Sequence, residues 1–458
     1  MRQLAAPICI LFIFYLFWRD RKEKDAFSSA LWIPLSWMFI AGSRYPSQWL
    51  ELRGGTMGYA MKYGVDAYVE GSPFDAVIFF GLIAAGVIVL MRRKVDWGLA
   101  LAQNKCIWIY LLYCGISIAW SDFPFVALKR WIKELGTVVM MLVILTDKRP
   151  YEAINVILKR LAFIWLPLSV LFIRFYGDWG RAYHMSGEVM YRGVGNQKND
   201  LGLICLFSMI CLMWNFLMNR KGGAKARRAD TIIDLVLLGM AVWLLHLSNS
   251  ATAMSCSVFA MTLLFMGRAK LIAQEPDRIM VILIVAAPLL FLLDSMLGLK
   301  ETALDILGRE ATLTARVPIW ELLREKVVDP VFGAGYNSFW LGDRMKSIWI
   351  QLGQPINQAH NGYLEQYLNL GYIGVAFIGA ILLSGLLKVR RYLKVDYPAA
   401  VLRLCFIAVA LLYNYTEASL CGINNVWLAF LFAVTEMPGP AKPAIIGQAM
   451  ESRLGTKK

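Results

Sequence analysis

His360 is one of three histidines in the chain, and it stands within the stretch NQAHNGYLEQYLNLGYIG. Asn361 follows it directly, and Glu365 comes shortly afterwards, where an apolar run begins. An imidazole titrates near neutral pH and can accept a proton from a hydroxyl group. We therefore predict that His360 positions or deprotonates a hydroxyl group. Asn361 and Glu365 are candidate supporting residues. For Glu365, as for Glu417 further along the chain, a structural role fits equally well.

A set of arginines and lysines could bind an anion together. The planar guanidinium of arginine donates two parallel hydrogen bonds to a phosphate, and several cations in nearby loops are typical of an anion-binding surface. For any single member, a solvated or snorkelling charge is an equally good interpretation. The set consists of Arg130, Lys133, Arg174, Arg181, Arg192, Lys198 and Arg316.

The stretch YRGVGNQKNDLG combines two of these cations with turn-forming glycines. Lys198 and Asn199 stand where the next helix is predicted to begin. Backbone N–H groups at a helix N-terminus, with Arg192 and Lys198 beside them, would suit a phosphate. The glycine and lysine spacing differs from that of a nucleotide P-loop. A helix start capped by Asn or Asp is the alternative interpretation.

Membrane-spanning helices must position these residues. Of the 458 residues, 58% are hydrophobic and only 17% are charged, whereas about a quarter of a soluble domain is charged. Several apolar runs approach the roughly 20 residues that cross ~30 Å of hydrocarbon. Alternating segments typical of a barrel are absent from the sequence. The sequence therefore predicts an all-α polytopic membrane protein.

About 12 to 13 membrane-spanning helices are expected, with the first kept as a helix rather than cleaved as a signal peptide. The predicted spans are 4–18, 28–43, 75–91, 104–120, 134–147, 159–175, 199–218, 231–247, 250–266, 279–297, 364–387, 399–416 and 422–436.

Clusters of lysine and arginine between these spans all fall on one side, which the positive-inside bias assigns to the cytoplasm. These clusters also explain the net charge of +15, so we do not expect a nucleic acid partner. One transmembrane domain, residues 1–436, is predicted to include a large periplasmic loop, 298–363. Residues 437–458 are predicted to form a disordered cytoplasmic tail. The other main outer loops are 44–74, 121–133 and 176–198.

Neither a metal nor a cofactor is predicted. The three histidines are scattered along the chain, and the eight cysteines have no metal-ligand or disulfide spacing.

These motifs, in this order, resemble the O-antigen ligase / O-antigen polymerase superfamily, which includes exopolysaccharide polymerases. RGVGNQKNDLG is similar to the family's R-G-x-F-x-H-K-N-x-L-G pattern, and LTARVPIWELL…DPVFGAGYNSFW to its R-x-x-x-W…P-x-x-G-x-G segment. AHNGYLEQYLNLGYIG is similar to its H-N-x-Y-L-E…G-x-x-G pattern, and WSDFPFVALKRW and YTEASL are similar too. The resemblance covers most of the chain. Gln197 stands where many members have a histidine, so any role of that histidine is absent here.

The resemblance implies a multi-pass glycosyltransferase of the bacterial inner membrane, with the GT-C-like architecture of enzymes that use lipid-linked donors. It implies a glycan donor on undecaprenyl pyrophosphate and an active site that faces the periplasm. The acceptor would be another lipid-linked repeat unit for a polymerase, or lipid A–core for a ligase. A chain-length regulator or export complex is a further implied partner, and no cofactor is implied.

Within that chemistry, the pyrophosphate gains negative charge as it leaves, and an acceptor hydroxyl attacks the opposite face of the sugar. Inversion at the anomeric carbon is therefore predicted. The predicted catalytic residues are His360, Arg316 and Arg192, and the predicted pyrophosphate-binding residues are Arg192, Lys198, Arg316 and Arg130. The predicted supporting residues are Asn199, Asn361, Glu365 and Glu417.

Two other functions remain open. The KNDLG form of the second motif is more similar to exopolysaccharide members, which favours a polymerase over a ligase that acts on lipid A–core. A flippase or transporter for the lipid-linked glycan is the alternative from another class. It would be expected to carry charges within its spans and to show internal repeats, and we find no such repeat.

Overall fold

The computed structural model describes residues 2–20, 27–51, 72–183, 187–218, 224–283 and 316–438. Most of the predicted span 279–297, the first part of the large loop and nearly all of the predicted tail lie outside the described residues.

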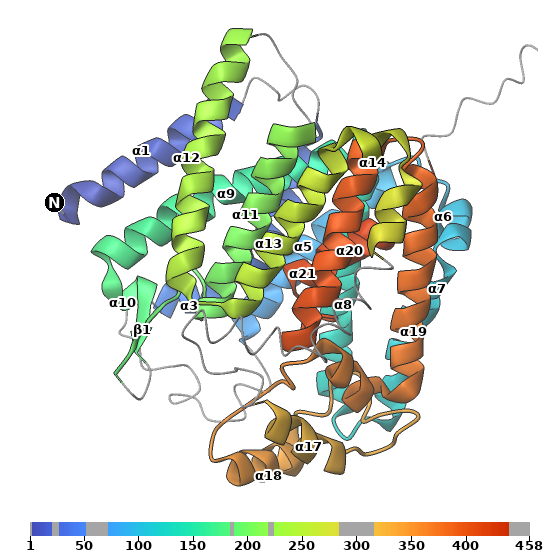
Figure 1. Ribbon diagram of the computed structural model, residues 1–458. Helices are drawn as coiled ribbons and strands as arrows, with labels where there is room; N and C mark the ends of the chain where they lie inside the picture. The colour runs from blue at the N-terminus through green and yellow to red at the C-terminus, as the bar shows by residue number, and fades with distance from the viewer. Residues whose placement is uncertain are drawn as a thin grey trace, which may run out of the picture.

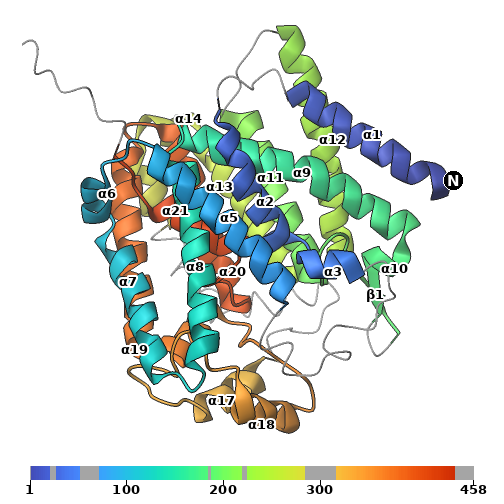
Figure 2. The ribbon, with the colours of Figure 1, turned by 180° about the vertical axis from the view of Figure 1, so that it is seen from behind.

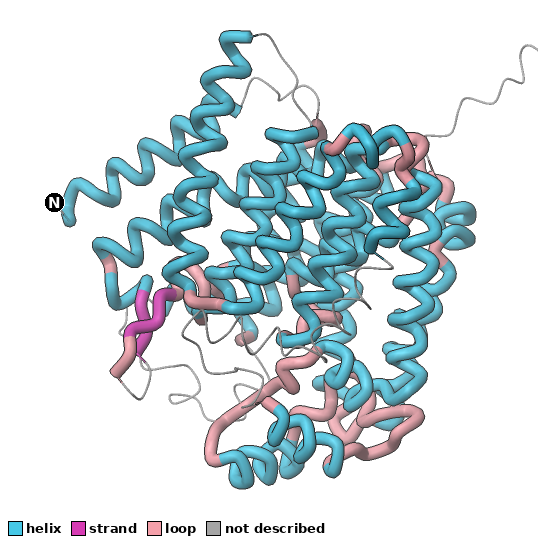
Figure 3. The backbone as a smooth tube through the Cα atoms, in the orientation of Figure 1, coloured by secondary structure: helices cyan, strands magenta, loops and turns pink. Residues whose placement is uncertain are grey.

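Helices form almost all of the regular structure in these residues (Figure 3). They are α1 (Arg2–Asp20), α2 (Trp32–Gly42), α3 (Pro46–Glu51), α5 (Pro73–Arg92), α6 (Trp97–Gln103), α7 (Lys105–Ile116), α8 (Pro124–Leu145), α9 (Pro150–Phe175), α10 (Gly177–Gly180), α11 (Lys198–Met218), α12 (Ala224–Ser248), α13 (Ala251–Arg268), α14 (Lys270–Gln274), α17 (Val317–Glu325), α18 (Gly342–Leu352), α19 (Gly362–Tyr392), α20 (Tyr397–Thr416) and α21 (Asn425–Val434). Two 3-10 helices, η2 (Ser29–Leu31) and η3 (Ser117–Trp120), and an antiparallel hairpin of β1 (Arg181–Tyr183) and β2 (Val189–Tyr191) complete the described elements.

Eight of the described helices are long and apolar enough to cross a membrane, and the pair α6 and α7, bent by 87°, would make a ninth. The eight are α1, α5, α9, α11, α12, α13, α19 and α20. Outer helices turn large apolar side chains outwards: Leu11 is 67% exposed and Phe14 is 68% exposed. Such side chains suit a lipid environment. The chain is therefore an all-α, multi-pass membrane protein, as the sequence predicts.

Predicted spans that fall within the described residues coincide with helices, but not all of these helices are long enough to cross a membrane. Residues 28–43 form η2 and the short α2, and residues 422–436 contain the 10-residue α21. Every residue of α21 is buried. This short apolar helix therefore packs inside the bundle. Apolar composition alone does not distinguish such a buried helix from a membrane span. The predicted span 134–147 lies mostly within α8.

A break in α19 ties the large loop into the bundle. Gly371 has φ 63° and ψ −165°, so the helix is interrupted there. The turn DPVFGAG fills the break: the amide of Tyr372 donates to the carbonyl of Pro330 at 2.9 Å, and the amide of Ala334 donates to that of Leu368 at 3.1 Å. A Cβ on Gly371 would lie 2.1 Å from a carbonyl oxygen of this turn. Only glycine fits both the backbone angle and the close approach.

Residues 316–361, here called the cap, cover one end of the bundle (Figures 1 and 2). Their helices α17 and α18 pack through Ile319, Leu323 and Ile348 into a second apolar cluster with Phe339 and Leu368. Leu368 belongs to the first part of α19, so this small core joins the cap to the bundle.

One basic segment, residues 388–394, lies at the end of the bundle opposite the cap (Figure 1). Asp277, which follows α14, pairs with Arg390 at 3.0 Å and with Lys394 at 3.2 Å. Figure 1 shows α14 at the far end from α17 and α18. This contact places residues 388–394 beside the segment that follows α14, while residues 21–24 and 219–223 of the other clusters lie outside the described residues. That all the clusters share one side, and that this side is the cytoplasm, stay predictions.

Candidate functional site

A capped turn holds His360 at the start of α19. His360 has φ 49°, in the left-handed region that few non-glycine residues adopt. The side chain of Asn361 accepts hydrogen bonds from the amides of Tyr363 and Leu364, each at 3.0 Å. These amides have no partner within the helix, so Asn361 is its N-cap. Asn361 thus fixes where α19 begins and how the His360 imidazole is presented.

Glu417 brings three of the predicted site residues together. It follows α20 directly and is 5% exposed. Its Oε2 lies 3.3 Å from Nδ1 of His360. Its Oε1 accepts hydrogen bonds from Asn199 Nδ2 at 2.8 Å and from Arg316 Nη2 at 3.2 Å. One carboxylate therefore connects the starts of α11, α17 and α19.

The pairing with Glu417 gives His360 the arrangement of an oriented base. A carboxylate at Nδ1 favours a proton on that nitrogen, which leaves the lone pair on Nε2 of a neutral imidazole. The same carboxylate stabilises the imidazolium that forms when Nε2 takes up a proton. The His360 side chain is 27% exposed, so it remains accessible to a substrate.

Arg316 is held by its neighbours. It donates to the carbonyl of Thr416 and to Glu417, and its side chain is 18% exposed. The guanidinium therefore balances the charge of Glu417. Direct binding of a pyrophosphate by Arg316 stays a prediction.

Two polar cavities meet beside this group and share Asn337, Asn357 and Glu365. The first, of about 460 Å³, is also lined by His360, and the second, of about 280 Å³, by Arg130. Amides, a carboxylate and an indole in one cleft suit a ligand that is rich in hydroxyl groups. Among the described residues, no group of three His, Cys, Asp or Glu side chains could hold a metal ion. The absence of a cofactor stays a prediction.

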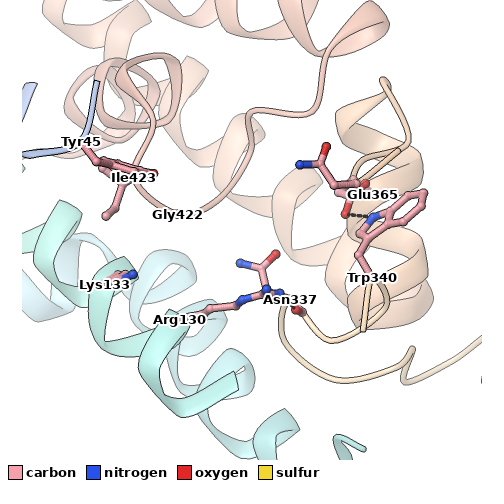
Figure 4. Close-up of a pocket in the computed structure, with 9 residues that line it drawn as sticks. Tyr45, Arg130, Lys133, Asn337, Trp340, Glu365, Gly422 and Ile423 are labelled. Atoms are coloured by element: carbon pink, nitrogen blue, oxygen red, sulfur yellow. Dashed lines mark hydrogen bonds between the residues drawn. The ribbon is translucent and has the colours of Figure 1, made fainter. Parts of the chain in front are cut away.

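Arg130 lies in the second cavity, together with Lys133 from the same helix, α8. Figure 4 shows both cations on one side of the cavity, with Trp340 and Glu365 on the other. Arg130 also donates to the carbonyl of Asn337, which has φ 49°. Arg130 thus contributes charge beside the first cavity and shapes the wall between the two.

Glu365 supports the walls of both cavities. It is 7% exposed. Its Oε1 accepts a hydrogen bond from Trp340 Nε1 at 2.7 Å, and its Oε2 accepts one from the amide of Ala359 at 2.8 Å. Asn369 Nδ2 donates to Oε1 at 3.1 Å. Glu365 therefore fixes the segment that leads into His360, which is the structural role that the sequence left open.

Arg192 is held at the hairpin. Its Nε donates to the carbonyl of Trp179 at 3.2 Å, and its Nη2 donates to that of Asp178 at 3.0 Å. Burial lowers the pKa of its guanidinium. In the part of the chain that the structure describes, Arg192 makes no hydrogen bond to His360 or Glu417. Among the described residues, Arg192 is therefore not in hydrogen-bond contact with the residues that it was predicted to act with.

The structure at the start of α11 can be compared with the two interpretations of YRGVGNQKNDLG. The Asp200 carboxylate accepts hydrogen bonds from the amides of Asn196 and Gln197 at 2.9 and 3.1 Å, so two backbone donors of the turn are already paired. This is the capped helix start that was the alternative to a phosphate cradle. Lys198 is partly exposed as the first residue of α11, and Asn199 reaches Glu417.

Glu134 is a site residue that the sequence analysis missed. It is fully buried in α8 and accepts hydrogen bonds from Tyr336 Oη at 2.9 Å, from the amide of Gly422 and from Trp427 Nε1. It therefore fixes the two loops that supply Asn337 and Gly422 to the second cavity. The sequence does carry a signal that could have revealed Glu134, because a carboxylate within an apolar run is unusual.

No protein-family model matches the chain. Over 362 residues, the chain is 22% identical to the exopolysaccharide production protein ExoQ of Rhizobium meliloti (strain 1021). The similarity covers 75% of this chain and 78% of that protein. It agrees, at a coarse level, with the resemblance to the O-antigen ligase / polymerase superfamily.

Proposed function

We propose that the protein is a membrane glycosyltransferase that extends an exopolysaccharide or O-antigen chain from a polyprenyl-diphosphate-linked donor. The observation that carries this proposal is Glu417, which orients His360 and binds Arg316 and Asn199 beside a polar double cavity. Similarity to an exopolysaccharide production protein supports the choice of glycan. The inner membrane and its periplasmic face are the proposed location.

The proposed reaction is a single displacement. Nε2 of His360 takes the proton of an acceptor hydroxyl, and that oxygen forms a bond to the anomeric carbon of the donor sugar. The bond from this carbon to the diphosphate oxygen breaks on the opposite face, and the diphosphate leaves with the electron pair. The configuration inverts, and Glu417 stabilises the imidazolium during the step.

Cations on both sides of the cavities are proposed to stabilise the leaving diphosphate. Arg130 lines the second cavity, whereas Lys198, Arg192 and Arg316 belong to the segments around Glu417 and the hairpin. In a site at the edge of the membrane, where water is scarce, such charges act more strongly than in bulk water. No nucleotide is needed, because the lipid diphosphate is itself the leaving group.

The proposal is tested in a strain that lacks the gene and carries either wild-type protein or a variant. His360→Ala and Arg316→Ala are each expected to abolish surface polymer on gels, while immunoblots show normal amounts of protein in the membrane. Lys346→Ala, which changes an exposed side chain of α18, is the matched control and should give normal polymer. Normal polymer from either site variant would contradict the proposed mechanism.

The deletion strain also separates the competing activities. Single repeat units on the cell surface indicate a lost polymerase, whereas accumulated lipid-linked long polymer indicates a lost ligase. Purified protein that lengthens glycans in detergent, with no second compartment, excludes a pure flippase.

A further inference from the structure

Arg44, which follows α2, is buried and has no charged partner among the described residues. It is 3% exposed. Its Nη2 donates to the carbonyl of Trp179 at 2.5 Å and to that of Gly193 at 3.4 Å. Its Nη1 is buried and has no hydrogen-bond partner in the part of the chain that the structure describes. Buried guanidinium nitrogens normally find acceptors, because an unsatisfied charged donor is costly. The missing partner of Nη1 therefore points to a ligand.

A second guanidinium lies beside Arg44. Arg192 Nε donates to the same Trp179 carbonyl oxygen, at 3.2 Å. Neither arginine forms an ion pair with a carboxylate among the described residues. Burial and the nearby charge of Arg192 lower the pKa of Arg44 to about 10, while Asp200 acts in the opposite direction. Both guanidinium groups remain charged at neutral pH, so two like charges share one neutral oxygen.

Aromatic side chains place this pair at the edge of the membrane. The ring of Trp49 lies 5.5 Å from the Arg44 guanidinium carbon, and the indole nitrogen of Trp49 is also buried without a partner. The ring of Trp179 stacks on Tyr176, just beyond the end of α9 at Phe175. Tryptophan and tyrosine gather where spans meet the headgroup layer. An anion at the level of lipid phosphates would therefore find Arg44 Nη1 and the neighbouring Arg192 as donors.

We propose that Arg44 and Arg192 together bind a phosphate group carried by a membrane lipid, and that Arg44 is a substrate-binding residue. The identity of that lipid as the polyprenyl diphosphate rests on the proposed function; the headgroup of a phospholipid has the same chemistry. Phosphate fits because two planar guanidinium groups offer charged N–H donors to its oxygens. Arg316, by contrast, is paired with the Glu417 carboxylate.

The test measures lipid binding directly, with full-length protein in detergent and native mass spectrometry. The probes are farnesyl diphosphate, phosphatidylglycerol and inorganic pyrophosphate. Arg44→Gln should weaken binding of the lipid phosphate roughly tenfold or more, because at least one charge-assisted hydrogen bond is lost. Arg149→Gln is the matched control: it removes an exposed arginine that is paired with Glu152 at the start of α9, and it should leave binding unchanged.

The probes separate the sources of the phosphate. Arg44-dependent binding of farnesyl diphosphate alone supports a donor site. Equal Arg44 dependence for phosphatidylglycerol supports a headgroup site, and Arg44-dependent binding of inorganic pyrophosphate supports a phosphate site that needs no lipid chain. Affinities that are the same in wild type and Arg44→Gln for all three probes overturn the proposal.

A folding defect would not hide the answer. If Arg44→Gln elutes as an aggregate, Arg44→Lys keeps the charge but loses the fork, and binding should still weaken measurably while the protein elutes normally. Full affinity in Arg44→Lys would then overturn the proposal. Glycosyl transfer is assayed separately. Arg44-dependent binding without any transfer would contradict the proposed function alone, and transfer without Arg44-dependent binding would contradict this inference alone.

Discussion

The two oxygens of the Glu417 carboxylate have different partners. Oε1 accepts hydrogen bonds from Arg316 and Asn199, whereas Oε2 faces His360. A glutamine keeps an oxygen for one set of donors but loses the negative charge. Replacement by glutamine therefore keeps an acceptor for the hydrogen bonds from α11 and Arg316, but removes the negative charge that would stabilise a protonated His360.

Glu417→Gln should reduce turnover by about 10²-fold or more, because the imidazolium of His360 loses its compensating charge. The rate of glycan extension by purified protein is the measurement. Glu321→Gln removes an exposed carboxylate from α17 and is the matched control. An unchanged rate for Glu417→Gln, at normal protein yield, would rule out an oriented base at His360.

Part of the candidate site could be predicted at the level of single residues. His360, Arg316, Asn199 and Glu417 were each singled out from the sequence, and the structure brings them into one hydrogen-bonded group. Their arrangement could not be predicted, because spacing along the chain does not tell which loops meet. For the same reason, the sequence did not reveal that Arg192 and Arg44 donate hydrogen bonds to the same backbone carbonyl, that of Trp179.

At the level of elements, the glycines of α19 have unequal roles. Gly371 sits at the break with a positive φ, and a Cβ there would collide with a backbone carbonyl of the inserted turn. Gly379 lies in the same helix, and a Cβ there would meet nothing within 4 Å. The two positions form a matched pair for testing whether the break is required.

Gly371→Ala should destabilise the protein by about 1–3 kcal/mol from the backbone angle alone, and by more once the collision is included. Gly379→Ala should be neutral or stabilising by up to about 1 kcal/mol, since alanine favours a helix. The measurement is the midpoint of heat-induced loss of the monodisperse peak in detergent. Equal midpoints for the two variants would show that the break in α19 is dispensable.

The helices themselves could largely be predicted from apolar runs, but the break in α19 could not. A run of apolar residues around Gly371 looks continuous in sequence, because nothing local reveals that a distant turn supplies its hydrogen bonds. The structure likewise shows that α21 is short and wholly buried, a distinction that depends on its neighbours rather than on its own residues.

At the scale of the whole molecule, α14 lies at the opposite end from α17 and α18 of the cap (Figure 1), and Lys394 pairs with Asp277, which follows α14. Cysteines introduced at Lys346 and Lys394 should therefore differ in accessibility. In right-side-out spheroplasts, an impermeant maleimide is expected to label Lys346→Cys, and to label Lys394→Cys only after permeabilisation. The native cysteines within the described residues are buried or half-buried, so background labelling should be low. The reverse pattern would invert the proposed orientation.

The overall class could be predicted because composition and apolar length depend little on tertiary contacts. The sequence could not predict how the cap joins the bundle, since Glu134 links α8 to loops far away in the chain.

The turn inserted at Gly371 has a consequence for how substrates would enter and leave the site. One end of the cap carries His360, and its middle is fastened into α19 by backbone hydrogen bonds. Swinging the cap aside as a lid would break those bonds, each worth about 1 kcal/mol net, together with the small core beneath it. We therefore expect the cap to stay in place, so that the lipid-linked substrates of the proposed function would enter and leave sideways from the bilayer.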